Sequence, residues 1–233
     1  MHNYLYFNNK NLDEFKIYVT NAGVYSTPAR NYDSISVAGR SGNLLIENNK
    51  FNNVEYRYPI VIYEDFNANF SALKSFLLSQ AGYQRLTDTF YPNEFYLATF
   101  KKFDDINQPY LNGDKGSCVL VFERKPQRYL KSGEKKLTFN AAGSLKNPTL
   151  FEALPFITVY GSGTLTINGI SVVINTEYAH LDIDCELQEV LQTEGNLDIT
   201  LTNGEFPSLI KGINNISFTG LSKVEITPRW YLL

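Results

Sequence analysis

The sequence GSGTLTINGISVVI at residues 161–174 has an Asn-Gly dipeptide between two runs in which apolar and polar residues alternate. Asn-Gly suits a two-residue type I′ turn, because both turn positions take positive φ. Pairing outward from this turn brings four apolar residues to one face, with Ile167 opposite Ile170 and Leu165 opposite Val172. The stretch therefore predicts a β-hairpin with one buried face.

The same period-2 alternation recurs on both sides of this hairpin. It appears in NVEYRY at residues 53–58, which leads into an apolar run at 60–63, and in LDIDCELQ at residues 181–188. β-branched and aromatic residues dominate these stretches, as they do in half-buried strands. The sequence therefore predicts a mainly β protein built from antiparallel sheets.

One segment, residues 69–81, has helical spacing instead. Phe70, Leu73 and Leu77 form an apolar stripe along it. Asn67 or Asn69 is suited to cap its start, and Gly82 to supply a left-handed residue at C′. We expect a single helix here, packed on the strands around it.

Composition divides the 233 residues into two parts. Residues 1–130 hold 13 of the 16 tyrosines and 11 of the 16 phenylalanines. A polar segment with Pro and Gly, KPQRYLKSGEKK at 125–136, has the composition of a domain connection. We therefore predict a β-sandwich domain with one packed helix at 1–135 and an antiparallel β-sandwich domain at 136–233.

Composition also argues against several classes of protein. The 43% apolar content is too high for a disordered chain, and the net charge of −3 offers no basic surface for nucleic acid. No apolar run is long enough to span a bilayer and the first residues lack a signal-peptide pattern, so we expect folding in a cytoplasm without membrane insertion. The two cysteines lie in no metal-binding or redox motif, so neither a zinc site nor a disulfide framework is expected.

The strongest candidate for chemistry is the carboxylate row Asp182, Asp184 and Glu186. Period-2 spacing places all three on one face of a strand, where they could bind Ca²⁺ or act as a glycosidase acid–base pair. The alternative is a solvated outer face opposite the apolar one. No nucleophile motif accompanies His180, and Cys118 and Cys185 have the setting of small core residues. We therefore expect no enzyme activity, no metal and no cofactor.

A carbohydrate-binding module is a second alternative, because lectin sites use exposed aromatic rings beside polar groups. The second domain offers four candidates for such a platform, Tyr160, Tyr178, Trp230 and Tyr231. Composition alone does not separate a glycan platform from ordinary sandwich lining.

Several stretches, in order along nearly the whole chain, resemble the distal tail protein (Dit) family of long-tailed, non-contractile phages that infect Gram-positive bacteria. In the stretch 6–19, Asn9 and Lys16 stand where glycines are commoner in the family, and in the loop at 37–45 Ala38 replaces a proline. The other similar stretches are VFERKPQRYL at 121–130, ITVYGSG at 157–163 and FPSLIKGINNI at 206–216.

This resemblance implies a structural virion protein at the distal end of the phage tail. Its N-terminal domains would form a six-membered ring, and its C-terminal domain would be a galectin-like sandwich. The ring would join the tail tube, made of the major tail protein, to the tail-tip and receptor-binding or baseplate proteins, and DNA would pass through its lumen. We expect a ring or tube contact at Gly39, Arg40, Gly42 and Asn43; a solvent-facing turn at Arg40 is the alternative reading.

Overall fold

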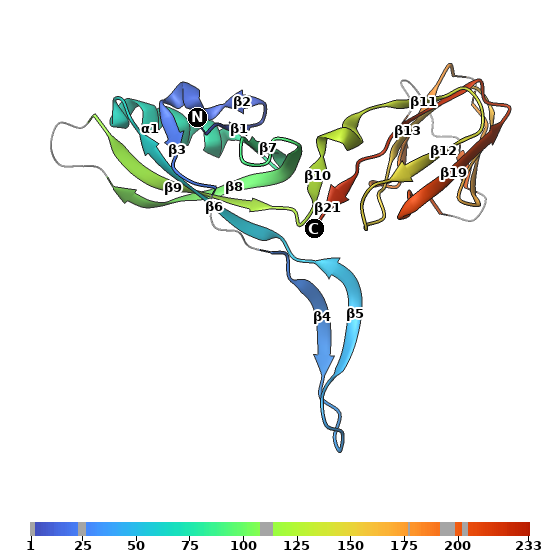
Figure 1. Cartoon of the computed structure of the whole chain (residues 1–233), viewed down its shortest axis with the longest axis horizontal. Helices are drawn as coiled ribbons and strands as arrows, with labels where there is room; N and C mark the ends of the chain where they lie inside the picture. The colour runs from blue at the N-terminus through green and yellow to red at the C-terminus, as the bar shows by residue number, and fades with distance from the viewer. Residues whose placement is uncertain (1–2, 23–26, 108–113, 177, 192–198, 202–204) are drawn as a thin grey trace. The chain divides into compact units, whose positions relative to one another are not determined.

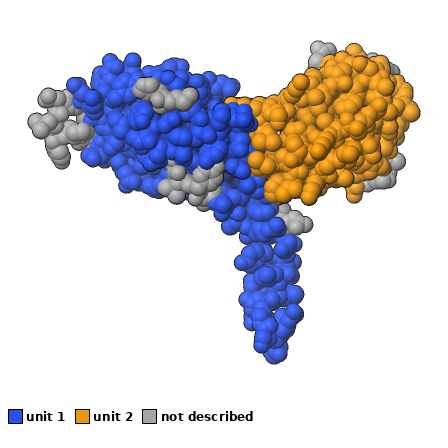
Figure 2. All heavy atoms as spheres, in the orientation of Figure 1, with its two compact units in different colours: residues 1–128, 233 blue, residues 129–232 orange. Residues whose placement is uncertain are grey.

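The computed structural model describes residues 3–22, 27–107, 114–176, 178–191, 199–201 and 205–233. The chain divides into two compact units, unit 1 with residues 1–128 and 233, and unit 2 with residues 129–232, coloured separately in Figure 2. Both are built mainly of antiparallel strands, which confirms the predicted fold class.

Unit 1 combines one large sheet, one α-helix and a separate pair of strands (Figure 1). Its elements are β1 (Leu5–Phe7), β2 (Lys10–Asn11), the 3-10 helix η1 (Leu12–Phe15), β3 (Ile17–Val19), β4 (Arg30–Ile35), β5 (Leu44–Phe51), β6 (Val54–Ile62), α1 (Phe66–Ser79), β7 (Gln84–Asp88), β8 (Glu94–Asn107) and β9 (Gly116–Arg124). The large sheet runs in the order β2-β1-β7-β8-β9-β6-β3, while β4 and β5 pair with each other.

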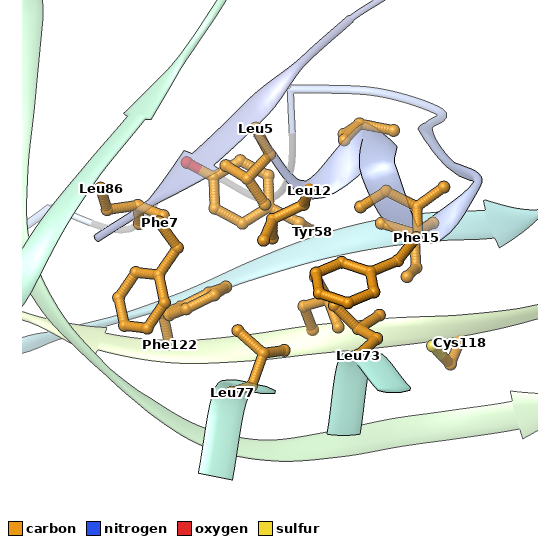
Figure 3. Packing of buried hydrophobic residues seen from close by; sticks show 14 of the residues in the cluster. Leu5, Phe7, Leu12, Phe15, Tyr58, Leu73, Leu77, Leu86, Cys118 and Phe122 are labelled. Atoms are coloured by element: carbon orange, nitrogen blue, oxygen red, sulfur yellow. The ribbon is translucent and has the colours of Figure 1, made fainter. Parts of the chain in front are cut away.

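The large sheet bends round its own core. Two strands separate β1 from β9, so on a flat sheet, with strands about 4.8 Å apart, they would lie about 14 Å from each other. Phe7 on β1 and Phe122 on β9 nevertheless have ring centroids 5.1 Å apart. Figure 3 shows these rings with Leu73 and Leu77 of α1 in the same cluster. The bent sheet and the helix α1 packed on it thus enclose the core of unit 1.

Alternation along β6 positions the aromatic core of unit 1. Every second residue of Val54–Ile62 is buried, as the sequence predicted, and the Tyr56 and Tyr58 rings are fully buried. The Tyr58 hydroxyl donates to Asp88 Oδ2 at 2.7 Å, and Asp88 Oδ1 accepts the backbone N–H groups of Phe90 and Tyr91 at 2.9 Å. Burial and the neighbouring Asp88 raise the pKa of Tyr58 well above its usual value. Part of the tyrosine surplus is therefore core.

Helix α1 begins three residues before the predicted start. Asp65 is its N-cap, with Oδ1 accepting the Ala68 N–H at 3.3 Å, so neither predicted asparagine is the cap. The Asn69 amide instead donates to the Glu64 and Asp65 carbonyls at 2.8 and 3.2 Å. The helix ends at Ser79 with an extended Gln80 as C-cap, so Gly82, although its φ is +67°, is not the C′ residue.

Unit 2 is a sandwich of two five-stranded sheets. One sheet has the order β11-β20-β13-β16-β17, and the other β12-β19-β14-β15-β18. The strands are β11 (Leu137–Phe139), β12 (Gly143–Asn147), β13 (Phe156–Tyr160), β14 (Gly163–Ile167), β15 (Ile170–Ile174), β16 (Leu181–Asp184), β17 (Glu189–Leu191), β18 (Ile199–Leu201), β19 (Gly212–Thr219) and β20 (Lys223–Thr227). Before them lie β10 (Arg128–Leu130) and the 3-10 helix η2 (Lys131–Glu134), and β21 (Tyr231–Leu232), which pairs with β10, follows.

The hairpin predicted around Asn168-Gly169 is confirmed in its register. Ile167 pairs with Ile170 and Leu165 with Val172. Asn168 and Gly169 have φ of +51° and +88°, as a type I′ turn requires. Local turn chemistry is therefore sufficient to set the central hairpin of unit 2.

Asn9 and Lys16, which stand where the family commonly has glycines, both adopt left-handed backbone conformations. Their φ angles are +61° and +56°. Asn tolerates this region because its short polar side chain can bond locally, whereas Lys has no such advantage. Lys16 ends η1, where its N–H donates to the Asp13 carbonyl at 2.8 Å.

We predict that Lys16→Gly stabilises unit 1. A residue with a Cβ raises the free energy of the folded state by roughly 1–2 kcal/mol when it adopts a left-handed conformation, and glycine avoids this strain. Glycine also has a freer unfolded chain, which offsets about 0.5–1 kcal/mol of the gain. The free energy of unfolding should rise by about 0.5–1 kcal/mol in urea titrations followed by circular dichroism. Glu14→Gly, within η1, is the control and should lower it; a loss of stability in Lys16→Gly would contradict the argument.

Candidate interaction surface

The predicted contact residues lie at the end of an isolated β-hairpin, which we call the arm (residues 30–51). Strands β4 and β5 form a two-stranded sheet of their own and pair with no other strand in the described part of the chain. Figure 1 shows this sheet standing apart from the large sheet of unit 1, with its connecting loop at the far end. Gly39, Arg40, Gly42 and Asn43 all belong to that loop.

The arm exposes apolar side chains on both faces. Cross-strand partners share a face, so Ile35 and Leu44 lie on one face with Ile46, and Tyr32 and Leu45 lie on the other. Their exposed fractions run from 42% for Leu44 to 57% for Leu45. An isolated two-stranded hairpin is only marginally stable in water. Contact of its apolar side chains with water is unfavourable on both faces. The arm therefore has the character of a surface that another molecule covers.

The loop turns through two glycines with positive φ. Gly39 and Gly42 have φ of +77° and +83°, a conformation that L-residues with a side chain adopt rarely. The Arg40 N–H donates to the Val37 carbonyl at 3.2 Å, and the Asn43 amide donates to Ser34 Oγ at 2.7 Å. Asn43 thus ties the loop to β4, and Arg40 is exposed. The structure brings the four predicted residues together but does not itself decide what they contact.

Polar groups hold the other end of the arm. The pairing register shifts between Asn31 and Tyr32, and Asn48 donates across the strands to Asn31 Oδ1 at 3.1 Å. The Arg30 guanidinium lies 5.0 Å from the centroid of the Phe51 ring and 3.8 Å from a Glu47 carboxylate oxygen. These contacts fix the base of the arm and leave its apolar outer half uncovered.

Sequence reasoning missed the apolar part of this surface. The signal was present in the consecutive run Leu44-Leu45-Ile46, since a strand with one buried face alternates and this run does not. A continuous apolar run predicts a strand that is covered on both faces, whereas the described residues of unit 1 leave both faces of this strand exposed.

Only Asp182 and Asp184 of the predicted carboxylate row lie on the strand, because β16 ends at Asp184 and residues 185–188 turn toward β17. Glu186 lies in that turn, 3.7 Å from the Arg229 guanidinium. Asp184 is 6% exposed, so it does not lie on a solvated outer face. Both its oxygens bind Arg229, at 2.7 and 2.8 Å, and Oδ1 also accepts the N–H groups of Glu186 and Leu187. Asp182 accepts from Thr158 Oγ1 at 2.6 Å. These bonds give the carboxylates structural roles.

The other candidate reactive groups also have structural surroundings. Cys118 and Cys185 are 2% and 1% exposed, which confirms them as core residues, and burial raises the pKa of each thiol to about 12. The His180 ring packs 5.7 Å from the Tyr160 ring. Among the described residues, no group of three His, Cys, Asp or Glu side chains is placed to hold a metal ion.

Three of the four aromatic candidates for a glycan platform are buried or packed against other side chains of unit 2. Trp230 is 5% exposed, Tyr231 stacks on Phe151, and the Lys223 ammonium lies 3.9 Å from the centroid of the Tyr160 ring. Tyr178 remains, with 42% of its surface exposed. A single exposed ring is a weak basis for a lectin site.

Two of the solved structures that this chain resembles are similar to it over nearly their full length. The crystal structure of the Dit protein of phage SPP1, described as a paradigm of the hub adsorption apparatus in phages infecting Gram-positive bacteria, aligns over 100% of both chains with a TM-score of 0.77 and 15% identity. A chain of the phage p2 baseplate, in its activated conformation with Sr, aligns over 97% of this chain and 96% of that one, with a TM-score of 0.56 and 11% identity.

The chain has the Dit fold. The resemblance read from the sequence is therefore confirmed for the fold over the whole chain. No protein-family model and no curated protein matches the sequence. Among the described residues, the structure contains no helix long and apolar enough to cross a membrane.

We predict that the Asp184–Arg229 pair makes unit 2 sensitive to acid. Burial raises the pKa of Asp184, but the bonds from Arg229 and two backbone N–H groups outweigh burial, and the net pKa is lowered. A carboxyl with a lowered folded pKa stabilises the protein above its unfolded pKa of about 3.9, and that contribution disappears as pH falls through the folded value.

Asp184→Asn removes this titration. At pH 7 it should lower the unfolding free energy of unit 2 by about 1–3 kcal/mol, because Arg229 loses its charged acceptor. Between pH 5 and pH 2 the variant should lose less further stability than the parent. Urea titrations at several pH values, followed by the fluorescence of the single tryptophan, Trp230, measure both effects. Parallel pH profiles would show that Asp184 is not the titrating group.

Proposed function

We propose that this chain is a structural hub protein of a phage tail, located at the distal end of the tail. In this proposal six copies form a ring that joins the tail tube to the tail-tip and to the receptor-binding or baseplate proteins. The observation that carries the proposal is the arm, which has two apolar faces that the described part of the chain leaves uncovered. The full-length likeness to a hub protein and to a baseplate chain supports it.

Ring formation would cover the apolar faces of the arm. A head-to-tail contact uses two different surfaces of each copy, and it closes into a ring when its rotation divides a full turn. If each arm lies on the neighbouring copy, the apolar side chains of residues 32–46 leave water once per subunit. Arg40, at the end of the arm, then meets either that neighbour or the tube protein.

The proposed role also fits the charge and chemistry of the chain. DNA passing through the lumen must not be held by phosphate contacts, and the net charge of −3 provides no strong attraction. The candidate reactive groups of unit 2, Asp184, Cys185 and His180, are bonded, buried or packed in structural positions. Assembly with other tail proteins accounts for these features better than catalysis.

Light scattering after size exclusion tests the ring directly. We predict a mass six times that of the 26.5 kDa chain, or a multiple of that hexamer mass. Electron microscopy should then show six-fold views. A species that keeps the mass of a single chain with the tail-tip proteins present would overturn the ring.

The double variant Leu45→Glu, Ile46→Glu tests the arm. Placing one charge on each face should reduce assembly to monomers, because a covered charge without a partner costs several kcal/mol. Both side chains are exposed in the single chain, so its own stability should change little. Leu187→Glu, at an exposed leucine of unit 2, is the control and should keep the mass of the parent. An unchanged mass in the double variant would show that the arm is not the ring contact.

Arg40→Ala tests the loop separately. Arginines at the centre of interfaces contribute more than about 1 kcal/mol, so we predict that assembly or tube attachment weakens by at least about fivefold. Lys50→Ala, at an exposed cation near the base of the arm, should leave both unchanged. If Arg40→Ala also preserves ring mass and tube attachment, Arg40 is a solvent-facing turn residue.

A further inference from the structure

The arm is joined to the rest of unit 1 by two short segments that belong to no strand. One consists of residues 27–29, before β4, and the other of Asn52 and Asn53, between β5 and β6 (Figure 1). The ladder of the large sheet ends at the pair Val54–Arg124, so Asn53 is the first residue outside it. Hinges are formed by a few residues at the ends of elements, which absorb changes in φ and ψ. Asn52 and Asn53 therefore have the position of a hinge.

The polar contacts within the arm do not restrain this hinge. In the described part of the chain, the side-chain hydrogen bonds and ion pairs of residues 30–51 join one part of the arm to another or to Asn52. The Asn52 N–H donates to the Ala29 carbonyl at 2.9 Å, and its Oδ1 accepts from the Asn31 amide at 3.4 Å. These bonds move with the arm, so they hold its strands together without fixing its direction.

The side-chain amide of Asn53 reaches back to the body of unit 1. It donates to the Tyr83 hydroxyl at 2.6 Å and to Glu123 Oε1 at 2.9 Å. An asparagine amide has two N–H donors, so both are used here. The bond to the carboxylate is strengthened by the charge of its acceptor. We call these three residues, Asn53, Tyr83 and Glu123, the clasp.

The two acceptors of the clasp belong to different parts of unit 1. Glu123 lies on β9, where its backbone is paired with Glu55 of β6 and with Thr99 of β8. Tyr83 precedes β7, and the Lys125 ammonium lies 5.6 Å from the centroid of its ring. Because the acceptors lie on separate elements, the two bonds together oppose rotation of the hinge in more than one direction.

The length of the arm makes a small rotation at its base a large displacement at its loop. The stretch from Asn53 to Leu44 spans about 30 Å at about 3.3 Å per residue. A rotation of about 10° at the base then moves the loop by about 5 Å, which is about the distance between neighbouring strands of a sheet. A contact between the outer arm and another molecule therefore depends on how firmly the base is held.

We propose that the clasp fixes the direction of the arm in the free subunit, and thereby the size of the ring into which the subunits close. A head-to-tail contact gives a single ring size only when every copy meets the next at the same angle, and variable angles give mixed rings or open chains. This inference rests on the proposed ring contact of the arm. It gives a positioning role to Asn53, which lies outside the apolar faces of the arm.

Asn53→Ala removes both bonds of the clasp and leaves the apolar faces of the arm unchanged. The distance between spin labels at Asp33→Cys, in β4, and Lys74→Cys, on α1, reports the direction of the arm. Both sites are exposed, whereas the native cysteines Cys118 and Cys185 are buried and should not take the label. The two labels thus measure how widely the arm moves relative to the body of unit 1.

Measurement in the background of Leu45→Glu, Ile46→Glu keeps assembly out of this test. For Asn53→Ala we expect a distance distribution broader by at least about 4 Å, which is the displacement of the label on β4 when the base rotates by about 10°. Tyr83→Phe keeps the ring but removes one acceptor, so it should broaden the distribution less. Asn52→Ala is the matched control, because the side-chain bond of this neighbouring exposed asparagine runs to the arm itself, and it should keep the parent width.

Ring closure is measured without labels and in the otherwise native chain. The parent should form one ring size by light scattering and electron microscopy. Asn53→Ala should still associate through the arm, but its share of six-membered rings should fall by at least about fivefold, as the loss of one net hydrogen bond allows. Open chains and other ring sizes should take their place. Asn52→Ala should give the rings of the parent.

Three results would overturn the inference. A distance distribution that Asn53→Ala leaves unchanged shows that the clasp does not set the direction of the arm. A broader distribution with an unchanged ring size shows that another contact determines closure. A parent chain that stays monomeric with the tail-tip proteins present removes the proposed ring and the role of the clasp in its size, whereas the distance distributions decide separately whether the clasp holds the arm.

Discussion

The contact between Phe7 and Phe122 is the constraint that makes unit 1 a folded body. Strands separated by two others in the sheet reach each other only if the sheet curls, and the two rings fill the space inside that curl. Tyr58 adds a ring 6.1 Å from Phe122 and directs its hydroxyl to the buried Asp88. Smaller side chains would leave this interior unfilled, at the energy cost that cavities carry. The core of unit 1 therefore accounts for many of the aromatic residues of its sequence.

The arm shows what the same kinds of residue do without such a core. Only Asn52 and Asn53 separate β5 from β6, and both strands are rich in apolar residues. β6 lies between β9 and β3 and buries alternate side chains, whereas β5, among the described strands, pairs with β4 alone and leaves its leucines exposed. The difference is set by neighbours and not by composition. An apolar hairpin that the described part of its own chain leaves uncovered fits the proposed contact with another molecule.

The same distinction separates what the sequence predicts from what it does not. The Asn168-Gly169 hairpin was predicted in register because turn chemistry and alternation are local. The helix was found, but its start was misplaced, since Asp65 caps it from a left-handed conformation that no nearby pattern indicates. The carboxylate row failed because Arg229, 45 positions away, draws Asp184 into a buried pair where the strand ends. The resemblance to a known family drew attention to the loop of the arm. The exposure of β4 and β5 was not predicted, because it depends on which other strands pack against them, and local sequence does not show this.

The way the arm is held implies how it would assemble. Its two strands are joined by backbone hydrogen bonds and by a few polar contacts at the base, but they enclose no core. Covering the arm would therefore add to the stability of the arm itself as well as to association. A contact of this kind couples folding to ring closure and favours a permanent assembly.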